Sequence, residues 1–154
     1  MEWMYNGAVF TPEQIGTAFG FVYLIICKSN GKTYVGKKFF TKATYKQVKG
    51  KRKKARKGSD WESYYGSNKI LLKDVQTLGP EMFERHILHL CQSRSECSYW
   101  ETYEIFTRHA LLGVNFYNDW VSAKITRTHM ASSMYAQQLK VNTHTIQPSS
   151  RTET

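Results

Sequence analysis

The stretch that decides the fold is residues 20–40, GFVYLIICKSNGKTYVGKKFF. Two runs rich in β-branched and aromatic residues flank Asn30-Gly31, a dipeptide typical of the two-residue type I′ turn. This pattern predicts a β-hairpin whose strands are residues 21–28 and 33–40.

The register of this hairpin would gather polar side chains on one face. With a two-residue loop, Tyr23 lies opposite Lys38 and Tyr34 lies opposite Cys27. Side chains alternate along a strand, so all four then point to the same side of the sheet. Strand tyrosines are more often core than catalytic, and the hairpin alone leaves both interpretations open.

Capping and periodicity signals predict three helices and one further strand. These elements are a short helix over 11–19, a helix over 68–78 capped by Ser67 and ended by Gly79-Pro80, a strand over 83–91, and a helix from Ser93 to about Leu112. The order predicts an α+β fold, with a small antiparallel three-stranded sheet flanked by helices. We expect one domain over residues 1–130, with a basic insertion at about 40–60, and a flexible tail over 131–154.

Length and composition narrow the class of protein. The chain has 154 residues and is 41% hydrophobic, enough for one compact domain with a real core. No run of about 18 apolar residues occurs, and MEWMYNGAVF at the N-terminus lacks the pattern of a secretory signal. Three cysteines, an odd number, favour a reducing compartment over a disulfide framework. We therefore expect a cytoplasmic protein that does not span a membrane.

Positive charge is concentrated in one segment. The chain has 22 Lys and Arg against 12 Asp and Glu, and residues 37–57 hold 11 of these bases and no acid. Such a strip suits phosphate binding with counterion release, although a solvated loop or a site for an acidic partner is an alternative. The predicted nucleic-acid-binding residues are Lys49, Lys51, Arg52, Lys53, Lys54, Arg56 and Lys57.

The predicted last helix carries charges within its apolar surface. At roughly 100° per residue, Glu101, Glu104 and Arg108 fall on one side of it. Glu104 and Arg108 can form an i,i+4 ion pair, which leaves Glu101 without a partner on the helix. A carboxylate in this position is a candidate ligand of a divalent metal ion.

Together these features resemble the GIY-YIG nuclease family. The resemblance rests on Phe21-Val22-Tyr23, Tyr34-Val35-Gly36, Glu101 on a helix, and Asn118 after that helix, and it covers about residues 20–119. Each short motif is weak alone, but their order and spacing together are specific. In size the chain is similar to the stand-alone members found in phage genomes.

Two positions depart from the family pattern. Phe21 stands where the first glycine is expected, with Gly20 one position earlier. The family's arginine about ten residues after the second tyrosine is also missing, since Thr44 occupies that position. Candidates to replace it are Arg52, Arg56, Lys38 and Lys69. Lys69 is favoured because it begins a predicted helix, whose N-terminus can help to hold a phosphate.

The resemblance implies an endonuclease that hydrolyses DNA phosphodiester bonds with Mg²⁺, or alternatively Mn²⁺. It implies that Glu101 binds the metal, that Tyr23 helps to deprotonate water beside Lys38, and that Asn118 orients the site. Tyr34 would bind the phosphate together with Lys69 or Lys38. With no second domain, we expect no appended module for base-specific recognition. The alternative is a non-catalytic nucleic-acid-binding module that retains the fold. If phage-encoded, the protein would act in the host cytoplasm.

Overall fold

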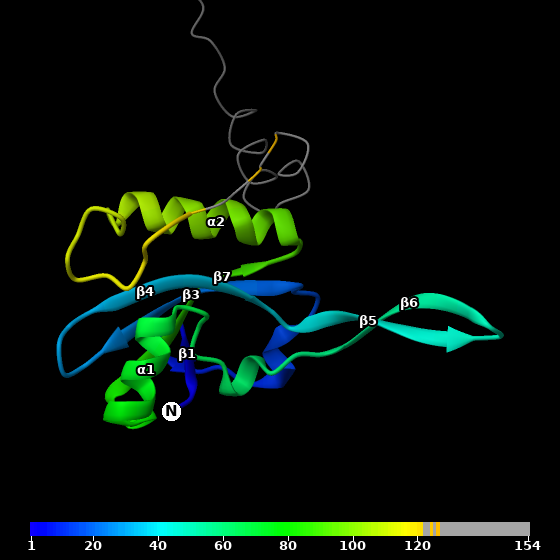
Figure 1. Ribbon diagram of the computed structural model, residues 1–154, viewed down its shortest axis with the longest axis horizontal. Coiled ribbons are helices and arrows are strands. Elements are labelled where there is room, and N and C mark those ends of the chain that lie inside the picture. The colour runs from blue at the N-terminus through cyan, green and yellow to red at the C-terminus, as the bar shows by residue number, and fades with distance from the viewer. Residues whose placement is uncertain (122–123, 125, 127–154) are drawn as a thin grey trace, which may run out of the picture.

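The computed structural model describes residues 1–121, 124 and 126, which form an α+β fold with one helix on each face of a sheet (Figure 1). The sheet has five strands in the order β2-β1-β7-β3-β4. The strands and helices are β1 Trp3–Tyr5, β2 Ala8–Val9, β3 Gly20–Cys27, β4 Thr33–Phe39, β5 Thr41–Val48, β6 Lys51–Gly58, β7 Phe83–Cys91, α1 Lys69–Leu78 and α2 Arg94–Thr107. Short 3-10 helices cover η1 Pro12–Ile15, η2 Trp61–Ser63 and η3 Pro80–Met82. The predicted tail, residues 131–154, lies outside the described residues.

The predicted three-stranded antiparallel sheet forms the β7-β3-β4 part of a larger, mixed sheet. The prediction missed β1 and β2, because strands of three and two residues give almost no alternation to detect. β1 runs parallel to β7, and Asn6-Gly7 turns the chain into β2 with positive φ at both residues. The predicted helix over 11–19 is limited to η1, because Gly16 leaves the helical conformation at φ 52°.

The β3–β4 hairpin forms as predicted, but its predicted register was wrong by two residues. Tyr23 pairs with Gly36 rather than with Lys38. The two-residue turn does not form, because Asn30 lacks the positive φ that a type I′ turn requires, and the N–H of Cys27 donates to the carbonyl of Lys32, which closes a four-residue loop over 28–31. A shift of two residues keeps every side chain on its predicted face, so the polar cluster on one face survives this correction.

The basic insertion is a β-hairpin and not the expected irregular loop. Strands β5 and β6 pair over their full length and project from the body of the molecule (Figure 1). Lys49 and Gly50 form the tip with φ of 49° and 72°, the conformation that a two-residue type I′ turn requires. Apolar alternation could not reveal these strands, because neither face packs on a core and most of their residues are exposed.

The two helices start and stop close to the predicted residues. Asn68, one residue after the predicted Ser67, caps α1 by accepting from two backbone N–H groups. Ser93 caps α2 as predicted, accepting from the backbone of Glu96. α2 ends at Thr107 rather than near Leu112, since the left-handed conformation of His109 breaks the helix.

Two apolar cores lie on opposite faces of the sheet. The larger holds Phe21, Tyr23, Phe83 and Leu71 of α1, and the smaller packs Val22 and Val35 against α2. The three cysteines are free and buried. Among the described residues, no helix has the length and apolar character needed to cross a membrane.

Candidate active site

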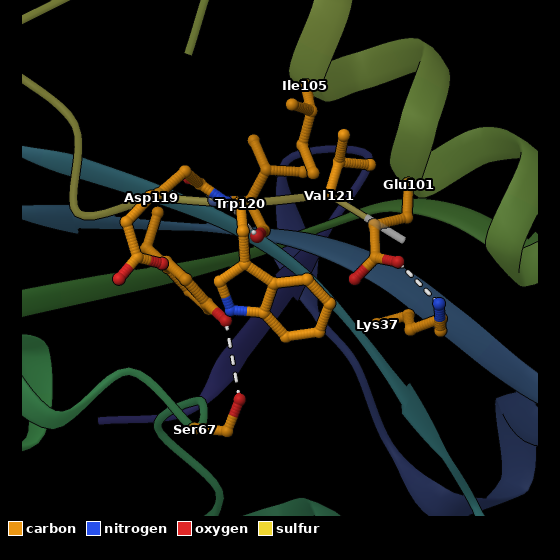
Figure 2. Close-up of a pocket in the computed structure, with 10 residues that line it drawn as sticks. Lys37, Ser67, Glu101, Ile105, Asp119, Trp120 and Val121 are labelled. Atoms are coloured by element: carbon orange, nitrogen blue, oxygen red, sulfur yellow. Dashed lines mark hydrogen bonds and ion pairs between the residues drawn. The ribbon is translucent and has the colours of Figure 1, made fainter. Parts of the chain in front are cut away.

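The candidate site lies along β4, the edge strand of the sheet. A pocket of about 210 Å³ opens there between β4, α2 and the segment that follows α2. Figure 2 shows Lys37, Glu101, Trp120 and Ser67 around it. Tyr34 and Asn118 also line this pocket, so the structure brings together residues that the sequence separates by 84 positions.

Tyr23 comes to this edge from the neighbouring strand, although its side chain is only 1% exposed. Its ring extends across Gly36 of β4, and a β-carbon at position 36 would lie 2.6 Å from Tyr23 Cζ and would overlap the hydroxyl. Gly36 therefore provides the space through which the Tyr23 hydroxyl reaches the edge of the sheet. Sequence parity alone placed Tyr23 on the correct face but did not reveal this contact.

Three tyrosines surround this position. The Tyr23 ring lies 6.2 Å from the ring centroids of both Tyr34 and Tyr64, and Tyr34 Oη is 3.5 Å from Ser67 Oγ. Burial raises the pKa of Tyr23 well above its usual value, and the nearby Tyr34, Tyr64 and Glu101 add to this increase. Burial also raises the pKa of Tyr34 and of Tyr64. The phenols are therefore protonated hydrogen-bonding groups at neutral pH.

Tyr64 was missed in the sequence, where its only signal was its place just before the Ser67-Asn68 helix cap. A buried guanidinium holds the loop that carries it: Arg85 Nη1 donates to the carbonyls of Glu62 at 2.9 Å and Tyr64 at 3.0 Å. The same guanidinium packs on the rings of Trp3 and Tyr65. Arg85 on β7 thus fixes the backbone of this loop at Glu62 and at the third tyrosine, Tyr64.

Lys38 does not lie opposite Tyr23, as the predicted register required. Its ammonium pairs with Asp60 Oδ1 at 2.8 Å and lies 3.6 Å above the centroid of the Tyr64 ring. Lys38 therefore reaches the tyrosine cluster through Tyr64 and is already neutralised by a carboxylate.

The neighbouring lysine, Lys37, makes the direct contact with the candidate metal ligand. Strand alternation turns Lys37 toward α2, where its Nζ lies 2.5 Å from Glu101 Oε2. Helical spacing predicted no partner for Glu101 on its own helix, and its partner comes instead from β4, 64 residues away. Lys37 was missed because only the tertiary fold brings it to α2.

Glu104, the other carboxylate of this helix surface, is not part of the pocket. Its side chain pairs with Arg108 at 2.8 Å, which confirms the predicted i,i+4 pair. Its second oxygen lies 2.6 Å from His89 Nε2, and the His89 ring stacks on Trp100. Both oxygens of Glu104 are thus occupied, whereas Glu101 faces the pocket.

Asn118 continues along the outer edge of β4 the pairing that residues 115–117 make with Thr33. Its Oδ1 accepts from the backbone N–H of Val35 at 2.9 Å, and its Nδ2 donates to the carbonyl of Val35 at 2.8 Å. The side-chain amide of Asn118 therefore makes the two hydrogen bonds with Val35 that a neighbouring strand would otherwise make. This double contact holds the segment that positions both tyrosines.

A comparison with protein-family models matches residues 3–121 to the model described as "Putative endonuclease segE, GIY-YIG domain". The chain belongs to the GIY-YIG endonuclease family. A comparison with curated proteins gave no match, and a comparison with solved structures gave none either. The matched range spans every strand and both helices, including the β5–β6 hairpin.

In this GIY-YIG domain, the candidates to replace the family's arginine lie in different places. Arg52 is near the tip of the β5–β6 hairpin, and Arg56 packs on Phe19 and Thr41 at its base. Lys69, the first residue of α1, lines a neighbouring pocket with Tyr34. Of these and the two β4 lysines, only Lys37 contacts Glu101.

The donor groups of the pocket suit one hard cation whose coordination shell is completed by the substrate. Glu101 and Asp119 are the carboxylates that line it, and no cluster of three or more His, Cys, Asp or Glu exists in the described part of the chain. Mg²⁺ is commonly bound by one or two carboxylates together with waters and substrate phosphates. The ammonium of Lys37 already occupies a cation position on Glu101. These residues therefore fit the metal that the family implies.

Proposed function

We propose that this protein is a divalent-metal-dependent endonuclease that hydrolyses phosphodiester bonds in DNA. The observation that carries the proposal is the meeting of two sets of residues at one strand edge. On one face of the sheet Tyr34 lines the pocket and Tyr23 is buried beside it over Gly36, while Lys37 and Glu101 line the pocket from the other face. Family membership over residues 3–121 gives this arrangement its chemical context.

Glu101 is the proposed ligand of Mg²⁺ or Mn²⁺, with Asp119 as the second carboxylate within the same pocket. When bound, such an ion stabilises negative charge that develops on phosphate oxygens. Tyr34 and Ser67 offer hydroxyl donors to the same phosphate from the α1 side of the pocket. Lys37 supplies the positive charge next to Glu101 and is the proposed replacement for the family's arginine.

Tyr23 contributes a neutral hydroxyl. Its raised pKa does not fit a free phenolate that removes a proton at neutral pH, because burial disfavours the charged form. We assign to Tyr23 the role of holding and orienting the attacking water by a hydrogen bond. In this role its position matters and its ionisation does not. Asn118 is a positioning residue, since it contacts the backbone of β4.

DNA binding is assigned to two surfaces. The β5–β6 hairpin presents exposed bases to the phosphate backbone, and those predicted from the sequence lie on β6 or at the tip: Lys49, Lys51, Arg52, Lys53, Lys54, Arg56 and Lys57. Trp120 lies at the mouth of the pocket with 69% of its surface exposed. An exposed indole beside a phosphate site is suited to stacking on a base.

The second candidate function is a DNA-binding module that does not cleave. Two observations favour it: among the described residues no arginine lines the pocket, and the carboxylate of Glu101 is neutralised by Lys37. Incubating supercoiled plasmid with the full chain in Mg²⁺, Mn²⁺ or EDTA distinguishes the two functions. The nuclease predicts nicked or linear product with a metal ion, none with EDTA, and none from the Glu101→Gln variant. Binding without product in either metal would support the second function.

A further inference from the structure

The β5–β6 hairpin has two chemically different faces, which its register defines. Directly paired residues share a face, and the pairs Tyr45–Lys54 and Gln47–Arg52 therefore lie on the same side. The mixed face comprises Ala43, Tyr45, Gln47, Arg52, Lys54 and Arg56. The lysine face carries Lys42, Lys46, Lys51, Lys53 and Lys57 as its charged residues, with the uncharged Thr44, Val48 and Ala55 between them. From this segregation we propose that the hairpin reads base sequence in the DNA major groove through its mixed face.

The residue types of the mixed face are those that read base edges. Arginine pairs with guanine and glutamine pairs with adenine through two hydrogen bonds each, whereas lysine serves phosphates as a point charge. Gln47 and Arg52 are direct partners next to the tip. If the hairpin bound only phosphates, it would need no glutamine. It would also have no reason to place its arginines on one face and to leave lysines as the only charged residues on the other.

The reading side chains are both exposed and held in place. The Arg52 guanidinium lies 4.2 Å above the centroid of the Tyr45 ring, which is itself 54% exposed. This stacking limits the rotamers of Arg52 while leaving its N–H groups available. Arg56, on the same face, is bound to Thr41 and packs on Phe19 at the base of the hairpin, and so it anchors the hairpin instead.

The shape of the hairpin fits one nucleic acid best. A two-stranded ribbon enters the major groove of B-form DNA, which is about 12 Å wide. The major groove of A-form RNA is too deep and narrow for side chains to read. The hairpin projects from the body of the molecule, so no other element blocks its entry (Figure 1). Duplex DNA is therefore the partner.

The hairpin is also coupled to the proposed site of cleavage. β4, which carries Tyr34 and Lys37, is separated from β5 by the single residue Phe40. Gln47 lies 13 residues after Tyr34, a span of at most about 47 Å. One turn of B-form DNA is about 34–36 Å long. The bases read by the hairpin should thus lie within about one and a half helical turns of the cut.

This inference rests on the proposed DNA substrate but not on cleavage, and it places base recognition in the hairpin rather than in an appended module. The test is the selection of bound duplexes from a randomised DNA library, using the full chain with Glu101→Gln so that no DNA is cut. Two double variants of neighbouring cross-strand pairs are compared. Gln47→Ala/Arg52→Ala alters the mixed face, and Lys46→Ala/Lys53→Ala alters the lysine face.

We expect the parent chain to select particular bases by about 5- to 140-fold per contacted pair, the discrimination that a bidentate contact provides. The mixed-face variant should lose this selection. The lysine-face variant should keep it while its log K against log[salt] slope falls by roughly 0.9 for each lost phosphate contact. The exchange variant Gln47→Arg/Arg52→Gln keeps the charge of the hairpin and should change which bases are selected.

Three outcomes would overturn the inference: no selection by the parent chain, equal selection by all variants, or equal loss from both double variants. A chain that selects bases yet never cuts plasmid carrying the selected sequence would uphold the inference and disprove the proposed nuclease. A chain that cuts plasmid without selecting bases would do the reverse.

Discussion

The hydroxyl of Tyr23 crosses Gly36 at the edge of the sheet, in the space that a side chain at position 36 would fill. Gly36 does not have a positive φ, so backbone freedom is not the reason that a glycine is needed there. Its role is to leave room for the buried phenol of Tyr23, which lies over β4. The two tripeptides of the GIY-YIG signature are thus linked by one steric contact.

Gly36→Ala should displace the Tyr23 ring and misplace its hydroxyl. We expect a stability loss of about 1–3 kcal/mol from overpacking and a fall in cleavage rate of about 100-fold. Gly58→Ala is the matched control, because a β-carbon at Gly58 meets nothing within 4 Å. Thermal melting and single-turnover plasmid cleavage measure both effects. Normal cleavage by Gly36→Ala would show that the Tyr23 hydroxyl has no part in the reaction.

Glu101→Gln should abolish cleavage while leaving duplex binding and melting temperature nearly unchanged. The substitution keeps the shape of the side chain but removes the charge that a metal ion needs. Glu104→Gln is the comparison on the same helix, since Glu104 is 8% exposed and holds both His89 and Arg108. It should cost about 1–3 kcal/mol of stability and keep the activity of the folded fraction. The reversed pattern would move the metal ligand to Glu104.

The elements that the sequence predicted well are those with strong local signals. β7 matches its predicted range of residues 83–91, and the Ser93 cap fixes the start of α2. Glu101 could likewise be identified as a candidate metal ligand, because helical spacing alone shows a charged residue within an apolar helix face.

What the sequence could not provide are contacts between distant segments. The Lys37–Glu101 pair joins β4 to α2 across 64 positions, and no local pattern encodes such a partner. The register of β3–β4 was missed for a local reason, because Asn30 does not take the positive φ of a type I′ turn and its Oδ1 instead accepts from the backbone N–H of Lys32 within a four-residue loop. The β5–β6 hairpin escaped detection because both of its faces are polar, so its strands show no alternation of apolar and polar residues.

Lys37→Met should reduce cleavage far more than Lys38→Met does. Methionine keeps much of the length of the side chain and removes the charge, and Lys37 is the lysine that contacts Glu101. Removing a preorganised charge from an active site costs about 100-fold or more in rate. Lys38 is already paired with Asp60, so its loss should have a smaller effect. Cleavage rates of the two variants, measured at saturating DNA, test this order. If Lys69→Met lost more activity than Lys37→Met, Lys69 would be the replacement for the family's arginine.

Asn118→Asp should loosen the edge of β4. Aspartate still accepts from the N–H of Val35, but it replaces the donor to the Val35 carbonyl with a negative charge facing that oxygen. We expect a stability loss of about 1–3 kcal/mol and reduced turnover with unchanged duplex affinity. Hydrogen exchange at the Val35 amide gives a local measurement. Unchanged exchange there would mean that Asn118 does not hold the strand.

The tyrosine cluster predicts a loss of stability at alkaline pH. Burial raises the pKa of Tyr23, Tyr34 and Tyr64 in the folded state, whereas in the unfolded chain these phenols ionise near pH 10. The unfolded state therefore releases its protons first as pH rises. The contribution of these groups to stability is complete below about pH 10 and is lost as pH rises from there through the folded pKa. Melting temperature between pH 8 and pH 12, together with phenolate absorbance, measures this change, and Tyr23→Phe should make the decline shallower. If Tyr23→Phe instead removed a phenolate signal that titrates near neutral pH, Tyr23 would be a free base and its role as a neutral hydrogen-bonding group would be wrong.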